Sequence, residues 1–361
     1  MPAPWSRGLD RLLRSPLAAV LTAPHGVERF LEQCDPLWSV DRVKARVVRV
    51  ERTAADTVVL GLRPNRHWAG FVAGQYLRVG VEVNGVWLTR CYSLSNAPAD
   101  GELEIAVKRQ GRVSQALFDA AQVGQLLMLS QAEGDFALPV DSPSSLLMIA
   151  GGSGITPIMA MLRKLHADAL RGAHPPRVSL RYYVQRRDQA VFADALRAMG
   201  ECHPDWDLRI LATREGGERF GVDTLRGLQE PHAQSPIYVC GPVALIEAVT
   251  AARAELGWNG RVLSERFTAD AFAPSGRAEG ELRFARSERF VPNDGRSLLD
   301  QAEAAGLRPD AGCRMGICHS CLCRKTGGRV RDLRNGQLSD DGEQHIQLCV
   351  SVAEGDVTLD L

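Results

Sequence analysis

The cysteines of this 361-residue chain fall into two groups, and one group is spaced for holding metal. That group lies near the C-terminus and consists of Cys313, Cys318, Cys321, Cys323 and Cys349. The scattered group consists of Cys34, Cys91, Cys202 and Cys240. Because clustered thiols are typical of metal sites in proteins that are not secreted, the C-terminal group predicts metal ligation rather than disulfide bonds.

The spacing of the C-terminal group, C-x4-C-x2-C followed by a distant fourth cysteine, fits a [2Fe–2S] cluster held by four thiolates. Gly316 lies within the run, where its bare backbone can wrap the cluster and aim N–H groups at the sulfurs. A structural zinc site, the alternative, usually has two C-x2-C pairs, and only one occurs here. A Rieske centre needs two histidines at ligand spacing, so His319 is expected at the surface instead of as a ligand. Cys323 exceeds the four ligands that the cluster needs and is expected to be a spare buried thiol. The predicted ligands are Cys313, Cys318, Cys321 and Cys349.

The segment 281–361, with a helix expected over 297–305 before the cysteine loop, resembles a plant-type ferredoxin. The resemblance implies a β-grasp (α+β) fold. A segment this short is expected to need its cofactor for stability.

A glycine-rich turn in the middle of the chain has the form of a phosphate-binding loop. The apolar run 146–150 leads into G-G-S-G-I-T-P at 151–157, so a strand, a glycine turn and a helix starting near proline follow one another. Further apolar runs alternate with helical stretches, which predicts an α/β domain with a parallel sheet covered on both faces. The predicted strands are 146–150, 178–184, 208–212 and 237–240, and the predicted helices 157–171, 190–200 and 242–256.

The preceding part of the chain alternates apolar and polar residues in the manner of strands, for example over 42–47 and 102–107. Asn84-Gly85 between two such runs is a strong hairpin signal. Short strands separated by turn residues predict an antiparallel β-barrel.

The end of one barrel strand, R-C-Y-S at 90–93, resembles the R-x-Y-S motif of the ferredoxin–NADP reductase superfamily. The resemblance implies that Arg90 neutralises a flavin pyrophosphate, Tyr92 packs on the isoalloxazine and Ser93 hydrogen-bonds near N5. Residues 107–114 resemble the second flavin-phosphate segment of the family. FAD is expected, with FMN as the alternative. The further flavin contacts implied are Val107, Lys108, Gly111 and Ser114.

The same superfamily has G-G-x-G-I-T-P, which implies that Gly152 and Gly154 approach the nucleotide and that Thr156 lies near the nicotinamide. C-G-P at 240–242 resembles the motif that places a cysteine beside the nicotinamide C4. It implies nucleotide contacts for Cys240 and Gly241.

E-R-F at 265–267 resembles the E-x-F that closes the family's nucleotide domain, which implies that Glu265 and Phe267 lie near the flavin. The catalytic residues implied by the resemblance are Ser93, Cys240 and Glu265.

T-R-E at 213–215 resembles the segment that grips a 2′-phosphate in NADPH-using relatives. Arg186 or Arg187 could add a second contact, because the arginine fork suits phosphate. Each of these arginines could equally be a solvated surface residue. The resemblance of T-R-E favours NADPH over NADH, with Arg214 as a contact of the 2′-phosphate.

The composition limits the partners. The 43 basic and 43 acidic residues balance, so no nucleic-acid partner is expected, and no apolar run is long enough to span a membrane. A cytoplasmic protein follows as the default. Five segments are predicted: an N-terminal extension at 1–38, an FAD-binding barrel at 39–140, an NAD(P)-binding α/β domain at 141–270, a linker at 271–280 and the ferredoxin-like domain at 281–361.

The order of these domains predicts an NAD(P)H-dependent oxidoreductase. NADPH gives two electrons as hydride, an iron–sulfur cluster accepts one at a time, and a flavin can stand between them. The proline-rich arm at 1–38 is expected to be a packed extension, with an amphipathic helix that touches a membrane as the alternative, and it resembles that of reductases serving membrane fatty-acyl (stearoyl-CoA type) desaturases. The resemblance leaves open a soluble aromatic or phenylacetyl-CoA type oxygenase as acceptor. A redox sensor or an electron-transfer subunit of a larger complex is a further alternative.

Overall fold

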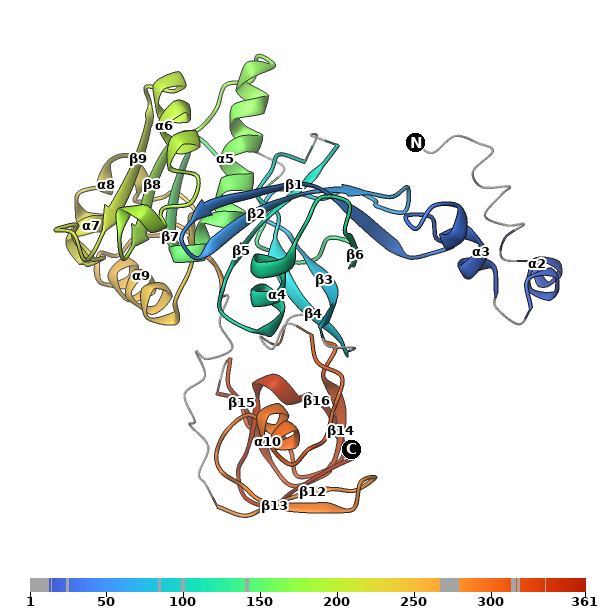
Figure 1. Cartoon of the computed structure of the whole chain (residues 1–361). Helices are drawn as coiled ribbons and strands as arrows, with labels where there is room; N and C mark the ends of the chain where they lie inside the picture. The colour runs from blue at the N-terminus through green and yellow to red at the C-terminus, as the bar shows by residue number, and fades with distance from the viewer. Residues whose placement is uncertain are drawn as a thin grey trace. The chain divides into compact units, whose positions relative to one another are not determined.

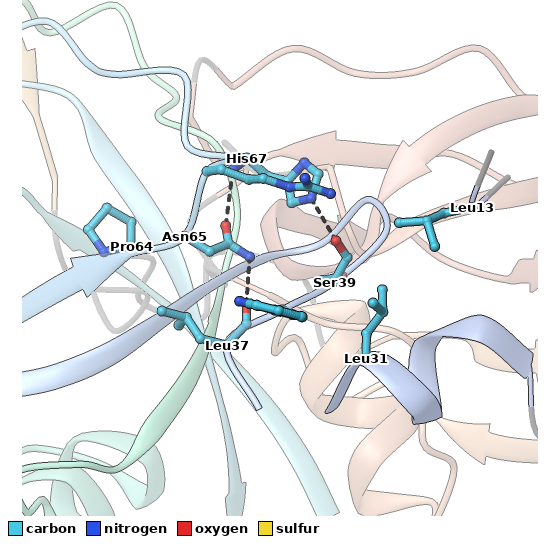
Figure 2. A pocket seen from close by; sticks show the side chains of 9 residues that line it. Leu13, Leu31, Leu37, Ser39, Pro64, Asn65 and His67 are labelled. Carbon is cyan, nitrogen blue, oxygen red and sulfur yellow. Dashed lines mark hydrogen bonds between the residues drawn. The ribbon is translucent and has the colours of Figure 1, made fainter. Parts of the chain in front are cut away.

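The structure is a computed structural model that describes residues 13, 15–23, 26–83, 86–98, 101–139, 143–266, 279–312, 316, 319–334 and 336–361. The chain forms two compact units, Met1–Glu265 and Arg266–Leu361 (Figure 1). No helix among the described residues is long and apolar enough to cross a membrane.

The arm contains two short helices, α2 (Pro16–Leu21) and α3 (Gly26–Cys34). Ion pairs attach α3 to the barrel, because Lys44 Nζ lies 3.2 Å from Glu28 Oε1 and 2.8 Å from Glu32 Oε1. In α2, by contrast, three apolar side chains are 67–75% exposed: Leu17, Val20 and Leu21. The expectation of a packed extension therefore holds for α3, through polar contacts, and is wrong for the apolar residues of α2.

The first domain of this unit is an antiparallel β-barrel, as predicted. Its six strands pair in the order β4-β3-β6-β1-β2-β5, and a bridge between Leu94 and Ile105 joins the two end strands. Val83 pairs with Val86 across β3 and β4, as the predicted hairpin requires, while Asn84 and Gly85 themselves lie outside the described residues. The elements are β1 (Val43–Ala54), β2 (Thr57–Pro64), β3 (Tyr76–Val83), β4 (Val86–Ser93), β5 (Leu103–Lys108), α4 (Arg112–Ala120) and β6 (Leu126–Leu129).

The nucleotide domain is built on a parallel sheet with the strand order β11-β10-β7-β8-β9. Apolar residues of α7 and α9 pack against β7 and β10, and α5 packs against the same two strands (Figure 1). The strands are β7 (Ser145–Gly151), β8 (Arg177–Val184), β9 (Trp206–Ala212), β10 (Ile237–Cys240) and β11 (Val262–Glu265). The helices are α5 (Ile155–Leu170), α6 (Ala193–Cys202), α7 (Val222–Arg226), α8 (Gln229–His232) and α9 (Val243–Glu255).

The second unit is a β-grasp domain whose main sheet has the order β13-β12-β18-β14-β16, with β15 and β17 paired beside it. Its helix α10 (Leu298–Ala304) begins at Ser297, whose hydroxyl accepts from the Asp300 amide at 3.2 Å. The strands are β12 (Glu281–Phe284), β13 (Arg289–Pro292), β14 (Leu322–Gly327), β15 (Val330–Asp332), β16 (Gln344–Gln347), β17 (Ser351–Ala353) and β18 (Val357–Leu359).

Candidate redox site

The R-C-Y-S residues lie at the end of β4. Side chains alternate along a strand, so Arg90 and Tyr92 share one face while Ser93, 4% exposed, lies on the other. Arg90 Nη1 donates to the Thr89 carbonyl at 2.7 Å. Burial raises the pKa of Tyr92, so its phenol stays neutral. The strand thus presents a cation and an aromatic ring together, which is the chemistry that a flavin diphosphate and ring system would need.

The second predicted flavin segment follows β5. Val107 is buried in the barrel core, and Lys108 Nζ lies 3.4 Å from an Asp56 oxygen. The Ser114 hydroxyl accepts from the Gly111 amide at 2.8 Å and donates to the Gly111 carbonyl at 3.0 Å. Ser114 therefore fixes the turn into α4, while the space beside Gly111 is open. The flavin contacts of these four residues remain predictions.

The glycine loop forms a short 3-10 turn, Gly152–Gly154, between β7 and α5. Gly152 has φ +54° and open space beside it, whereas a Cβ on Gly154 would lie 2.1 Å from the Cys240 carbonyl oxygen. Thr156, buried in the first turn of α5, donates its hydroxyl to the Ser153 carbonyl at 3.0 Å. The loop therefore packs its backbone on the end of β10 and leaves the first amides of α5 beside an open glycine, an arrangement suited to an anion.

The three residues predicted to be catalytic meet where the barrel and the nucleotide domain touch. Cys240 and Glu265 pair side by side at the ends of β10 and β11. From the barrel, the Ser93 hydroxyl donates to Glu265 Oε2 at 3.4 Å. Gly241 lies against the backbone of Gly151. Phe267 lies outside the described residues.

Burial decides the charge state of this group of residues. It raises the pKa of Glu265 to about 8, against a weaker opposing effect of the hydrogen bond from Ser93. Burial and the neighbouring Glu265 raise the pKa of the Cys240 thiol well above its usual value. Near neutral pH the site therefore holds a carboxylic acid and a thiol rather than two anions. A half-buried carboxyl with one long hydrogen bond among its described contacts fits a site that gains a further polar partner when a ring system binds.

The arginines predicted to select the nucleotide lie at the ends of β8 and β9. The Arg214 amide donates to the Gln185 carbonyl at 2.9 Å, which brings the two strand ends together, and its side chain is exposed. Arg186 Nε lies 3.9 Å from Glu215 Oε1, and the Arg187 amide donates to Glu215 Oε2 at 3.3 Å. The cluster is compatible with a 2′-phosphate, and its selectivity remains a prediction.

In the second unit, two of the predicted cluster ligands lie together. The sulfurs of Cys321 and Cys349 are 3.2 Å apart and both side chains are buried. That separation is too long for a disulfide, and two thiolates at this spacing fit a single metal ion. Cys313 and Cys318 lie outside the described residues. As predicted, Cys323 is buried, which raises its pKa to about 11, and His319 is exposed.

Two residues that sequence reasoning missed hold the cysteine loop at its centre. Arg334 Nη1 and Gln347 Nε2 donate to the Gly316 carbonyl at 2.7 and 2.9 Å. Gly316 itself has φ +75°, and a Cβ there would lie 2.8 Å from Val350. Neither Arg334 nor Gln347 belongs to a recognisable motif, so only the folded chain shows their contact with the loop. When bound, a [2Fe–2S] cluster held here would supply one-electron transfer.

Three family models match the chain in the same order as its domains. They are described as an oxidoreductase FAD-binding domain at 44–138, an oxidoreductase NAD-binding domain at 148–251 and a 2Fe-2S iron-sulfur cluster binding domain at 284–354. These matches agree with the motifs assigned above, so the cofactors are FAD, a nicotinamide nucleotide and a [2Fe–2S] cluster.

Curated relatives match most of the chain. An NADPH oxidoreductase of Mycobacterium tuberculosis is 34% identical over 96% of this chain and 91% of its own length. The reductase subunit of a Pseudomonas putida phthalate 4,5-dioxygenase is 31% identical over 81% of this chain and 87% of its own. Among solved structures, phthalate dioxygenase reductase is 28% identical, with a TM-score of 0.61, and covers 88% of this chain and 97% of that one.

The three family models, the fold of each domain and relatives that align over most of both chains all agree on one assignment. The chain is an NAD(P)H-dependent oxidoreductase and belongs to the ferredoxin–NADP reductase superfamily, among the flavoproteins that end in a plant-type [2Fe–2S] domain.

Proposed function

We propose that this protein takes hydride from NADPH and delivers single electrons, through FAD and its [2Fe–2S] cluster, to the terminal component of an oxygenase. The observation that carries the proposal is the group of buried Ser93, buried Cys240 and half-buried Glu265 between the flavin and nucleotide domains, in a chain that also carries cluster thiols. Hydride transfer needs the two rings held together away from water, and this is the part of the fold where the two domains meet.

The choice of acceptor rests on the relatives. Their printed names include reductase components of a 3-ketosteroid-9-alpha-monooxygenase, a phthalate dioxygenase and a glycine betaine monooxygenase. The fatty-acyl desaturase expected from the arm finds no support in these names, so an oxygenase is the better acceptor.

A membrane desaturase is kept as the second candidate because of the arm. The exposed apolar residues of α2, Leu17, Val20 and Leu21, are suited to contact with an apolar surface. The Mycobacterium tuberculosis relative aligns over 96% of this chain and so reaches into the arm, and its name specifies no acceptor.

The test measures NADPH oxidation and product formation with two acceptors, a purified aromatic-ring oxygenase component with its substrate and desaturase-containing membranes with labelled stearoyl-CoA. We expect hydroxylated product with the oxygenase. Desaturated product alone would replace this proposal with the second candidate. Product from neither, with cytochrome c still reduced, would reject both acceptors.

A cluster variant tests the electron path. Cys321→Ser should abolish reduction of cytochrome c and of the terminal acceptor, while NADPH-to-ferricyanide turnover through the flavin continues. Cys202→Ser, at an exposed cysteine outside the C-terminal group, is the matched control and should leave both activities intact. Loss of ferricyanide turnover in folded, FAD-loaded Cys321→Ser would contradict the proposed path.

A further inference from the structure

A group of charges around the buried Glu104 joins the barrel to the nucleotide domain away from the three residues predicted to be catalytic. Arg163, midway along α5, donates from Nη1 to Glu104 Oε1 on β5 and to the Ser95 carbonyl at 2.9 Å. The Ser95 hydroxyl donates to the same Glu104 oxygen at 2.7 Å, and Arg49 Nη2 donates to the other oxygen at 2.6 Å. We call Arg49, Ser95, Glu104 and Arg163 the interdomain charge cluster.

The carboxylate at the centre of the interdomain charge cluster is shielded from water. The Glu104 side chain is 10% exposed, that of Arg163 is 24% exposed and that of Arg49 is 37% exposed. Burial by itself would raise the pKa of Glu104, but Arg163, Arg49 and Ser95 outweigh it and hold the pKa below its usual value. The Arg163 guanidinium also lies 5.0 Å from the centre of the Phe192 ring. Removal of Glu104 or Arg163 would leave the other charge with fewer contacts at a site shielded from water, which would lower the free energy of unfolding.

Two members of the cluster lie close along the chain to predicted site residues. Ser95 follows Ser93 by two residues, just beyond the end of β4. Arg163 lies on the same helix as Thr156, about 10 Å further along its axis at 1.5 Å per residue. Because a helix behaves as a rod, a shift at Arg163 moves the first turn of α5 with it. The cluster therefore connects the flavin side of the site to its nicotinamide side.

Other contacts already attach the two domains. The Tyr238 hydroxyl donates to the Ala137 carbonyl at 3.0 Å, and its ring packs edge-on against Phe136 at 5.4 Å between centroids. These contacts are on β10 and on the segment after β6, away from Glu104. The charge cluster adds a further, directional point of contact to these and to the Ser93–Glu265 hydrogen bond, and separated points of contact fix an orientation that a single point leaves free to rotate.

We propose that Glu104 and Arg163 are positioning residues that set the orientation of the nucleotide domain against the flavin domain for hydride transfer. A displacement of about 1 Å at the reacting atoms can reduce a rate by about 100-fold, so a pair distant from the chemistry can control it. The proposal rests on the flavin and nucleotide roles assigned above. It concerns only the reduction of the flavin by NADPH, so it can fail or succeed whatever the final acceptor is.

The test compares Glu104→Gln and Arg163→Met with the matched control Glu102→Gln, whose carboxylate pairs with Arg63 within the barrel. Stopped-flow mixing with NADPH, without any acceptor, gives the limiting rate of flavin reduction, the NADPH dissociation constant and the charge-transfer absorbance of nicotinamide stacked on flavin. We expect the limiting rate to fall by about 10- to 100-fold in the first two variants. The charge-transfer absorbance should weaken, while NADPH affinity and FAD content change less than about twofold. Glu102→Gln should match the wild type.

Arg163→Lys covers the case in which the stronger variants do not fold, since it keeps the charge but loses the forked contact to Glu104 and Ser95. It should fold, bind FAD and reduce the flavin more slowly than the wild type. An unchanged limiting rate in any folded, FAD-loaded variant at Glu104 or Arg163 would overturn the proposal. Weaker NADPH binding at an unchanged limiting rate would also overturn it, because Arg163 would then act in nucleotide binding.

Discussion

Polar side chains are buried at both edges of the parallel sheet. The two edges differ in how many hydrogen-bond partners the protein provides for these side chains. At the edge where the strands begin, His232 contacts Ser235 Oγ at 3.1 Å through Nδ1 and Ser179 Oγ at 2.8 Å through Nε2. Ser235 in turn contacts Ser145 Oγ at 2.5 Å. At the edge where the strands end, Glu265 has one hydrogen bond of 3.4 Å, from Ser93, among its described contacts.

The difference separates a structural polar cluster from a functional one. Both key groups are neutral near pH 7, since burial lowers the pKa of His232 to about 4 and raises that of Glu265 to about 8. The histidine network is closed by protein partners at both ring nitrogens, so it has no capacity left for a ligand. The Glu265 carboxyl has one long hydrogen bond among its described contacts, so it can form a further hydrogen bond to a cofactor.

The largest effect is expected where the functional edge depends on backbone contact. Gly154→Ala would place a Cβ 2.1 Å from the Cys240 carbonyl oxygen, so one of the two backbones must move. We expect a loss of about 4 kcal/mol or more in the free energy of unfolding, measured by urea titration, together with loss of nucleotide binding. Gly200→Ala, in α6 with open space beside it, is the control and should gain about 0.5–1 kcal/mol. Equal stability of the two variants would show that the glycine loop does not pack on β10 as described.

The next effect tests the chemistry of the functional edge. Glu265→Gln keeps the shape of the side chain but removes its acidic proton, so the limiting rate of flavin reduction by NADPH should fall by about 100-fold, measured by stopped flow. In the wild type the plot of this rate against pH should show a change with a pKa near 8, and the plot for the variant should lack that change. His232→Gln, at the opposite edge, should reduce its flavin at the wild-type rate. If both variants were equally slow, the contrast between the edges would be lost.

A smaller effect concerns stability at low pH and comes from the closed network. The folded pKa of His232, about 4, is below the ordinary 6.5, so the unfolded chain takes up a proton first as the pH falls. Stability is therefore lost between about pH 6.5 and 4, and about 2 kcal/mol of that loss should appear between pH 7 and pH 5. Glu265 acts in the opposite sense and costs stability as the pH rises from 4.5 to 8.

Urea titrations of wild type and His232→Gln at pH 7 and pH 5 separate this contribution from the others. The wild type should lose about 2 kcal/mol more than the variant on acidification. An equal loss in both proteins would mean that the His232 imidazole has the same pKa in the folded and the unfolded chain, so that the network does not hold it neutral.

The sequence predicted the functional edge better than the structural one. The motif at 151–157 could be placed because a glycine turn between a strand and a helix leaves a local signal, and Cys240 and Glu265 because C-G-P and E-R-F resemble motifs of the family. The His232 network left none, because its serines come from three separate strand starts and meet only when the sheet forms. Glu104 and Arg163 were missed for the same reason, since each is an ordinary charged residue on a strand or helix. The apolar exposure of α2 also depends on what packs against it, which a local pattern does not contain.

The smallest effect expected lies at the exposed rim of the functional edge. Arg214→Ala removes a cation just beyond β9 that is suited to a 2′-phosphate, so the KM for NADPH should rise by about tenfold while the KM for NADH changes little. The fold should be unaffected, because the Arg214 backbone keeps its hydrogen bond to Gln185. Steady-state ferricyanide reduction with each nucleotide measures both constants. Arg197→Ala, exposed on α6 and paired with Asp194, is the control and should change neither. An equal rise for both nucleotides would assign Arg214 to a part of the nucleotide that NADH and NADPH share, and the 2′-phosphate contact would then have to come from Arg186 or Arg187.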